Sequence, residues 1–143
     1  MATLGLVSLR GLYAEAFIWT FYGASGMTAA DKGKAVTLDT TAANTVKLAG
    51  DGEAILGILE SVEVRAQDGV ITCAVALKGS FKFELNPNAT ASAPDELPVV
   101  GEYIEGGTAS GGAKGYVQRL QSGTSKWQVV EVVGTSYVVA MSI

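Results

Sequence analysis

The feature that most constrains the fold is an alternating run of apolar residues between positions 71 and 85. Every second side chain in it is apolar, namely Ile71, Cys73, Val75, Leu77, Phe81, Phe83 and Leu85. A period of two places successive side chains on opposite faces of a strand, so these residues share one face. The pattern breaks only at Gly79, and an isolated glycine in a strand often marks a bulge or a bend. The run predicts one long strand, or two strands joined at Gly79.

The residues on either side of this run extend the same β pattern. Short apolar runs with polar neighbours occupy residues 36–38, 46–48, 55–64, 99–105, 116–120, 127–133 and 136–143. Segments rich in Gly, Asp, Asn, Thr or Pro separate them, and such segments are typical of turns and loops. The sequence therefore predicts an all-β domain, a small antiparallel barrel or sandwich, over residues 33–143.

Residues 1–32 differ from the rest and are predicted to form an extended N-terminal arm and linker, with a short helical turn at 28–32. Aromatic side chains are concentrated there, and such a segment must be buried against something. It packs either on its own domain, as an edge strand or plug, or on a neighbouring subunit or partner, because aromatic residues are enriched at interfaces. The residues expected to make such interface contacts are Leu4, Leu6, Leu9, Leu12, Tyr13, Phe17, Trp19, Phe21 and Tyr22.

The C-terminal residues predict a hairpin with two apolar faces. A two-residue turn at Gly134-Thr135 would place Val133 opposite Ser136. One face would then carry Val130, Val132, Tyr137, Val139, Met141 and Ile143, and the other Trp127, Val129, Glu131, Val133, Val138 and Ala140. A hairpin with one wet face alternates more cleanly. One face is therefore expected to meet the core and the other a neighbouring subunit, with Trp127, Val129 and Val138 as interface candidates.

Several kinds of catalytic site lack the residues they need. The chain has no histidine, which removes the commonest general base and Ser-His or Cys-His nucleophiles. Its single cysteine, Cys73, rules out an intrachain disulfide and is predicted to be a small buried residue. The glycine-rich loop at 106–115 does not match a phosphate-binding loop. The acidic pairs Asp51/Glu53 and Asp95/Glu96 lack calcium-loop spacing and are interpreted as solvated turn residues. We expect no cofactor, no metal and no enzymatic activity.

Net charge and hydropathy limit the classes of partner and the cellular location that the chain can have. The net charge of −4 argues against nucleic acid, whose binding depends on lysine and arginine. The most apolar window, at 16–26, is shorter than a membrane span. No basic segment precedes it, so a secretory signal is not expected.

A small trimeric all-β enzyme such as a nucleotide hydrolase fits the length, but the phosphate and metal motifs it needs are not found.

Several short segments resemble the capsid decoration (cement) proteins of tailed bacteriophages. They are GKAVTL at 33–38, AGDGEAILGILE at 49–60 and PVVGEYI at 98–104, together with SLRG at 8–11 and YGASGM at 22–27. The resemblance covers most of the chain. It implies a β-tulip-like barrel domain, trimers or similar oligomers on the outer capsid surface, and no catalysis.

The function expected from this resemblance is structural. The chain would be a virion protein that stabilises the phage capsid by bridging neighbouring capsomers, with the major capsid protein and further copies of itself, a trimer being favoured, as partners. It would be made in the cytoplasm of the bacterial host and reside on the outer capsid surface. The alternative is a carbohydrate-binding β module of a head fibre or tail component, in which Trp19 and Trp127 would stack on sugar rings.

Overall fold

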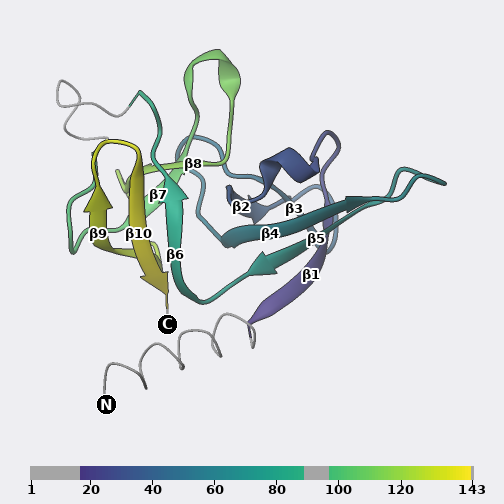
Figure 1. Ribbon diagram of the computed structural model, residues 1–143, viewed down its shortest axis with the longest axis horizontal. Helices are drawn as coiled ribbons and strands as arrows, with labels where there is room; N and C mark the ends of the chain where they lie inside the picture. Colours follow the sequence, from purple (N-terminus) through teal and green to yellow (C-terminus); the bar gives the residue numbers. More distant parts are fainter. Residues whose placement is uncertain (1–16, 89–96, 143) are drawn as a thin grey trace.

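The computed structural model describes residues 17–88 and 97–142, and strands dominate this part of the chain (Figure 1). The strands are β1 (Ile18–Gly23), β2 (Ala35–Leu38), β3 (Thr45–Leu48), β4 (Gly57–Val64), β5 (Ile71–Ala76), β6 (Gly79–Glu84), β7 (Ile104–Gly107), β8 (Tyr116–Arg119), β9 (Gln128–Val133) and β10 (Tyr137–Ser142). Two single-turn 3-10 helices accompany them, η1 (Ala29–Asp31) and η2 (Ser110–Gly112). The predicted all-β class is confirmed.

The first five strands close into a barrel in the order β1-β3-β2-β4-β5. Its neighbours are antiparallel except for β1 and β3, which run parallel. The barrel prediction is therefore confirmed, with one parallel pair that the sequence did not predict. The interior is filled by Met27, Val36, Val46, Leu59, Cys73 and Val75. Burial raises the pKa of the Cys73 thiol, in keeping with its predicted place in a core.

The remaining strands pack beside the barrel as two small sheets, β6-β10-β9 and β7-β8 (Figure 1). They enclose a second core around Trp127, whose ring makes an edge-to-face contact with Phe83 at a centroid distance of 5.1 Å. Phe81 lies 6.2 Å from the same ring. Edge-to-face aromatic pairs are favourable beyond the area they bury. This aromatic cluster is therefore the centre of the second core.

One wall of the barrel separates the two cores and contributes to both. Adjacent residues in β2, β4 and β5 point to opposite sides of this wall, as the period of two requires. Val36, Leu59 and Val75 lie in the barrel core, whereas Ala35, Ile58 and Ala76 lie in the Trp127 core. A strand that is buried on both faces has continuous apolar sequence. This explains the unbroken apolar stretch at the start of β4.

The alternating run at 71–85 forms two strands, β5 and β6, joined at Gly79 as predicted. Gly79 has φ 126°, a conformation that favours glycine. The buried residues are odd-numbered on both sides of the bend, but those before it and those after it enter different cores. Cys73 and Val75 fill the barrel, whereas Phe83 and Leu85 fill the Trp127 core. The run therefore links the barrel to the second sheet.

The structure corrects the predicted boundary between an arm and a β domain at residue 33. Strand β1 is an integral barrel strand that pairs with β5 over Ile18–Tyr22 and with β3 at Tyr22 and Gly23. The helical turn predicted at 28–32 is confirmed as η1, which Thr28 and Asp31 stabilise through a capping box. Residues 1–16 lie outside the described residues.

The terminal hairpin is also corrected. Its loop has three residues, because Tyr137 rather than Ser136 lies opposite Val133. The register then shifts between Val139 and Ala140, which leaves Val130 as an extra residue in β9. This bulge changes the parity of β9, so Val129 and Val132 both pack against the Trp127 core. The predicted face assignment is therefore wrong for Glu131, Val132 and Val133, and Ile143 lies outside the described residues.

Candidate interaction surface

Strand β1 presents the most exposed aromatic side chains of the described residues. Trp19 is 61% exposed and Tyr22 is 54% exposed, and Ile18 beside them is 37% exposed. The strand sequence IWTFYG contains no charged residue. Phe21 is partly buried against the barrel core and anchors the strand. Ile18 and Tyr22 lie on one face of the strand, and Trp19 lies on the other face with Phe21. Strand β1 therefore exposes uncharged, apolar side chains on both faces, and large apolar side chains in solvent are typical of interaction sites.

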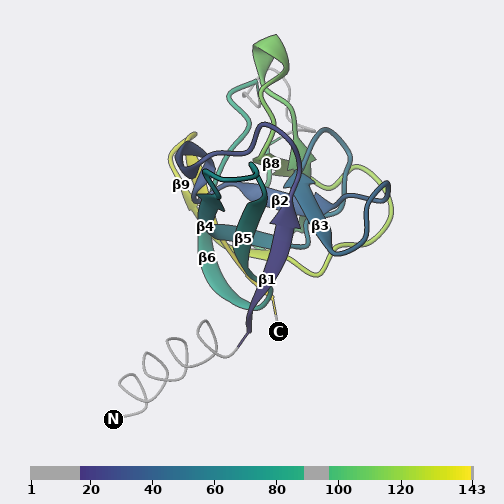
Figure 2. The ribbon, with the colours of Figure 1, turned by 90° about the vertical axis from the view of Figure 1, so that its right-hand side faces the viewer.

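One edge of the same strand is only partly covered by a neighbour. Strand β5 pairs with β1 from Ile18 to Tyr22, but β3 begins only opposite Tyr22. Figure 2 shows β1 in purple between β5 and β3, with β3 beside its far end. Within the described residues, Ile18–Phe21 therefore has a strand neighbour on one side only.

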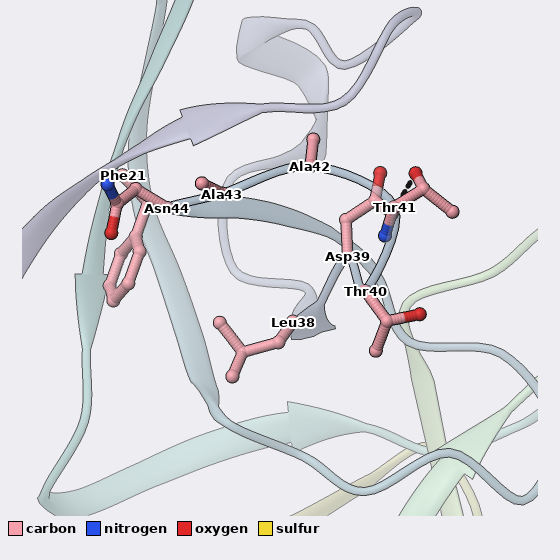
Figure 3. A pocket seen from close by; sticks show the side chains of 8 residues that line it. All are labelled: Phe21, Leu38, Asp39, Thr40, Thr41, Ala42, Ala43 and Asn44. Carbon is pink, nitrogen blue, oxygen red and sulfur yellow. Dashed lines mark hydrogen bonds between the residues drawn. The ribbon is translucent and has the colours of Figure 1, made fainter.

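An open hollow of about 440 Å³ lies beside this edge, where β3 begins (Figure 3). Phe21 and Leu38 form its apolar part, and the turn at 39–44 completes the lining. Asp39 Oδ1 accepts hydrogen bonds from the Thr41 hydroxyl at 2.6 Å and from the Thr41 backbone N–H at 3.0 Å. These bonds hold the pKa of the Asp39 carboxyl below its usual value. The carboxylate is therefore engaged in shaping the turn.

A second exposed surface covers the outward face of the β6-β10-β9 sheet. Val130, Val133 and Tyr137 are between 37% and 41% exposed there. Charged residues lie among them, including Lys82, whose Nζ sits 4.1 Å from the centre of the Tyr137 ring, and Glu131, which is opposite Val139. This face is more polar than β1.

The three interface residues predicted in the terminal hairpin are wrong. Trp127 and Val138 are 0% exposed and Val129 is 1% exposed, so all three are buried inside the chain's own core. The sequence revealed two apolar faces but not the barrel wall that covers one of them. Among the predicted arm residues, Trp19 and Tyr22 are exposed, and Phe17 and Phe21 are partly buried. Leu4, Leu6, Leu9, Leu12 and Tyr13 lie outside the described residues.

A buried polar cluster beneath the β7-β8 hairpin was not predicted. Gln118 Nε2 donates to Asp51 Oδ1 at 2.6 Å and to Glu105 Oε1 at 3.2 Å. Asn86 Nδ2 donates to Gln118 Oε1 at 3.1 Å and to the Thr108 carbonyl at 3.2 Å. Asn86, Glu105 and Gln118 are all buried. The cluster joins the hairpin to the turn between β3 and β4. Its only signal in the sequence was one polar residue within each of the two paired strands, Glu105 in β7 and Gln118 in β8.

The turn acids Asp51 and Glu53 are structural rather than merely solvated, which corrects their interpretation. Glu53 Oε2 lies 2.9 Å from Lys47 Nζ, and its Oε1 accepts the Gly50 N–H at 2.8 Å. Burial raises the pKa of Glu53, but these hydrogen bonds and the charges of Lys47 and Lys114 outweigh it, so the pKa lies below its usual value. The other predicted pair, Asp95 and Glu96, lies outside the described residues.

Two further findings concern the same part of the chain. Among residues 17–88 and 97–142, no group of three or more His, Cys, Asp or Glu side chains is placed to hold a metal ion. No helix in these two ranges has the length and apolar character needed to cross a membrane.

Comparisons with protein-family models, with curated protein sequences and with solved structures find no match for the chain.

Proposed function

We propose that this chain is a structural virion protein that decorates a bacteriophage capsid and stabilises it by bridging neighbouring capsomers. The observation that supports the proposal is the exposure of uncharged, apolar side chains on β1, with Ile18 and Tyr22 on one face of the strand and Trp19 on the other. Aromatic side chains are enriched among the residues that anchor protein interfaces. Because Trp127, Val129 and Val138 are buried within the chain, β1 is the part of the predicted contact set that remains available among the described residues.

The mechanism is the addition of apolar contact area between capsid subunits. Apolar burial contributes about 25 cal/mol per Å². An aromatic side chain has about 150–250 Å² to bury. Trp19 and Tyr22 are each about half exposed, so complete burial of either contributes about 2–3 kcal/mol before the cost of association. Repetition over a shell multiplies this contribution.

The proposal also includes the partner, the location and the oligomeric state expected from the sequence. The partner is the major capsid protein, the location is the outer surface of the virion, and the chain acts as a homo-oligomer, with a trimer favoured by the resemblance. No cofactor, nucleic acid, membrane or catalytic step is needed for this role.

Co-sedimentation with capsids tests the proposal. Expanded heads of the phage that encodes the chain, prepared without it, would be incubated with the native chain and with Trp19→Ala. We expect the native chain to sediment with the heads and to raise their thermal disruption temperature, and Trp19→Ala to bind more weakly. Val130→Ala, which truncates an exposed residue on the other surface, is the matched control and should bind like the native chain. Failure of the native chain to bind expanded heads would overturn the proposal.

A carbohydrate-binding module is the second candidate, and one observation favours it. Trp19 is exposed on β1 two residues before Phe21, which lines a hollow together with Leu38 and the polar turn at 39–44. An exposed indole ring beside polar groups is suited to stacking on a sugar. Of the two tryptophans assigned to this role from sequence, Trp127 is unavailable because it is fully buried.

Tryptophan fluorescence separates the two candidates. Sugar binding at Trp19 should change the emission of the native chain and not that of Trp19→Phe. A broad glycan array with no bound ligand would remove this second candidate and leave capsid binding untouched.

A further inference from the structure

The free edge of β1 has the chemistry of a strand-pairing site. The Phe17 carbonyl accepts a hydrogen bond from the Leu77 N–H on the β5 side, at 2.9 Å. The Tyr22 N–H donates in the opposite direction, to the Asn44 carbonyl at 2.8 Å. Backbone groups of successive residues alternate between the two edges of a strand, so those of Ile18 and Thr20 point away from β5. Within the described residues, β3 does not extend far enough to meet them.

This edge lacks the features that normally prevent pairing with another chain. Proteins protect exposed edges with charged residues, proline or bulges. Strand β9, one of the two outer strands of the β6-β10-β9 sheet, has both Glu131 and the bulge at Val130. The β1 segment has no charge and no proline, and its register with β5 is unbroken. The two edges thus differ in how well they exclude a second strand.

We propose that two copies of this chain pair through the free edges of their β1 strands and form a symmetric dimer. In an antiparallel arrangement centred on Trp19, Ile18 of each copy lies opposite Thr20 of the other. Both pairs can then exchange N–H···O bonds, which satisfies the outward-facing groups of both residues. The two Trp19 side chains become cross-strand neighbours, and aromatic pairs in this position are stabilising. The same strand supplies both halves of the interface, as a twofold axis requires.

The local geometry leaves room for this pairing. The free segment Ile18–Phe21 is about 13 Å long at the usual rise of a strand, enough for the two bonded pairs. In this register Phe17 of the second copy lies opposite Phe21, which lines the hollow together with the turn at 39–44. Pairing stops at Tyr22, where β3 already occupies the edge. The dimer takes the place of the trimer that the resemblance favours. It is a property of the chain in solution and does not depend on capsid binding.

Light scattering of the full chain over a concentration series tests the proposal. We expect a mass of twice the 14.7 kDa of one chain, falling to a single chain on dilution. Thr20→Pro removes the outward N–H without removing a bond to β5, and Trp19→Lys places two like charges at the twofold axis. Both variants are expected to halve the mass. Val130→Lys is the matched control, because it places the same charge on an exposed valine of the other sheet, and it should leave the mass unchanged.

Amide hydrogen exchange gives an independent reading of the same edge. The Ile18 and Thr20 amides should exchange more slowly as the native chain is concentrated, and this dependence should be lost in Trp19→Lys. Trp19 is exposed, so its substitution keeps the test valid even if Thr20→Pro does not fold. A native chain that is monomeric at every concentration would overturn the proposal. So would a trimer or dimer whose mass Trp19→Lys leaves unchanged.

Discussion

The two tryptophans of the chain occupy opposite environments, although Trp19 lies within strand β1 and Trp127 directly precedes strand β9. Trp19 lies on β1 with more than half of its surface in solvent, whereas Trp127 is enclosed by Phe81, Phe83 and the outer wall of the barrel. The barrel wall covers the Trp127 side of the molecule, and no described element covers Trp19. The difference teaches that a second layer, and not the alternation of the strand itself, decides which aromatic residue becomes core and which remains available for binding.

The largest effect is expected from truncating the buried ring. Trp127→Ala should lower the free energy of unfolding by about 3–5 kcal/mol, because it removes apolar burial and leaves a cavity between Phe81 and Phe83. Trp19→Ala, the control in the barrel, should change it by less than about 0.5 kcal/mol. Urea unfolding followed by circular dichroism measures both. Equal losses for the two variants would contradict the contrast.

The buried polar cluster joins the two regions, and its removal should have the next largest effect. Gln118→Ala withdraws the amide that donates to both Asp51 and Glu105 and leaves the buried Glu105 carboxylate without that bond. A buried polar group without its partner costs about 1–3 kcal/mol. The same unfolding experiment should detect this loss, with the exposed turn residue Gln67 as the control in Gln67→Ala. A Gln118→Ala variant as stable as the native chain would mean that the cluster does not tie the hairpin to the barrel.

Much of the barrel could be predicted from the sequence because its determinants are local. The alternation from Ile71 to Leu85, the bend at Gly79, the burial of Cys73 and the helical turn beginning at Thr28 all depend on residues close together in the chain. Each of them follows from strand periodicity, glycine conformation or helix capping.

The parts that were missed depend on distant residues. Strand β1 could not be placed in the barrel because its partners, near Thr45 and Cys73, lie far along the chain and alternation does not specify a partner. The burial of Trp127 requires the barrel wall as a second layer. The bulge at Val130 reverses parity within one strand, so a strict period of two misassigns Val132. The Asp51–Gln118 bond joins positions 67 residues apart.

A smaller effect is expected within the barrel, from the Lys47–Glu53 pair. Glu53→Gln should lower the free energy of unfolding by about 0.5–1 kcal/mol at neutral pH, because both side chains are about one-third exposed and solvent screens the pair. The pKa of Glu53 is lowered in the folded chain, so its contribution is present above the pKa of the unfolded chain. It is lost as the pH falls through the folded pKa. Unfolding measured across acidic pH should therefore show a smaller difference between native and variant than at neutral pH, and a constant difference would contradict this origin.

The most direct reading of the contrast comes from exchanging each tryptophan for phenylalanine and measuring quenching by iodide, a change in emission rather than in stability. A dissolved anion reaches an exposed indole and not a buried one. In dilute solution, Trp127→Phe should keep emission that iodide quenches strongly, because only Trp19 remains, and Trp19→Phe should keep emission that iodide hardly affects. Quenching of Trp19 should weaken as the chain is concentrated, since pairing of the β1 edges would bring the two indole rings together. Quenching that is strong at every concentration would separate the two ideas, leaving the exposure of Trp19 intact while removing its place at a dimer axis.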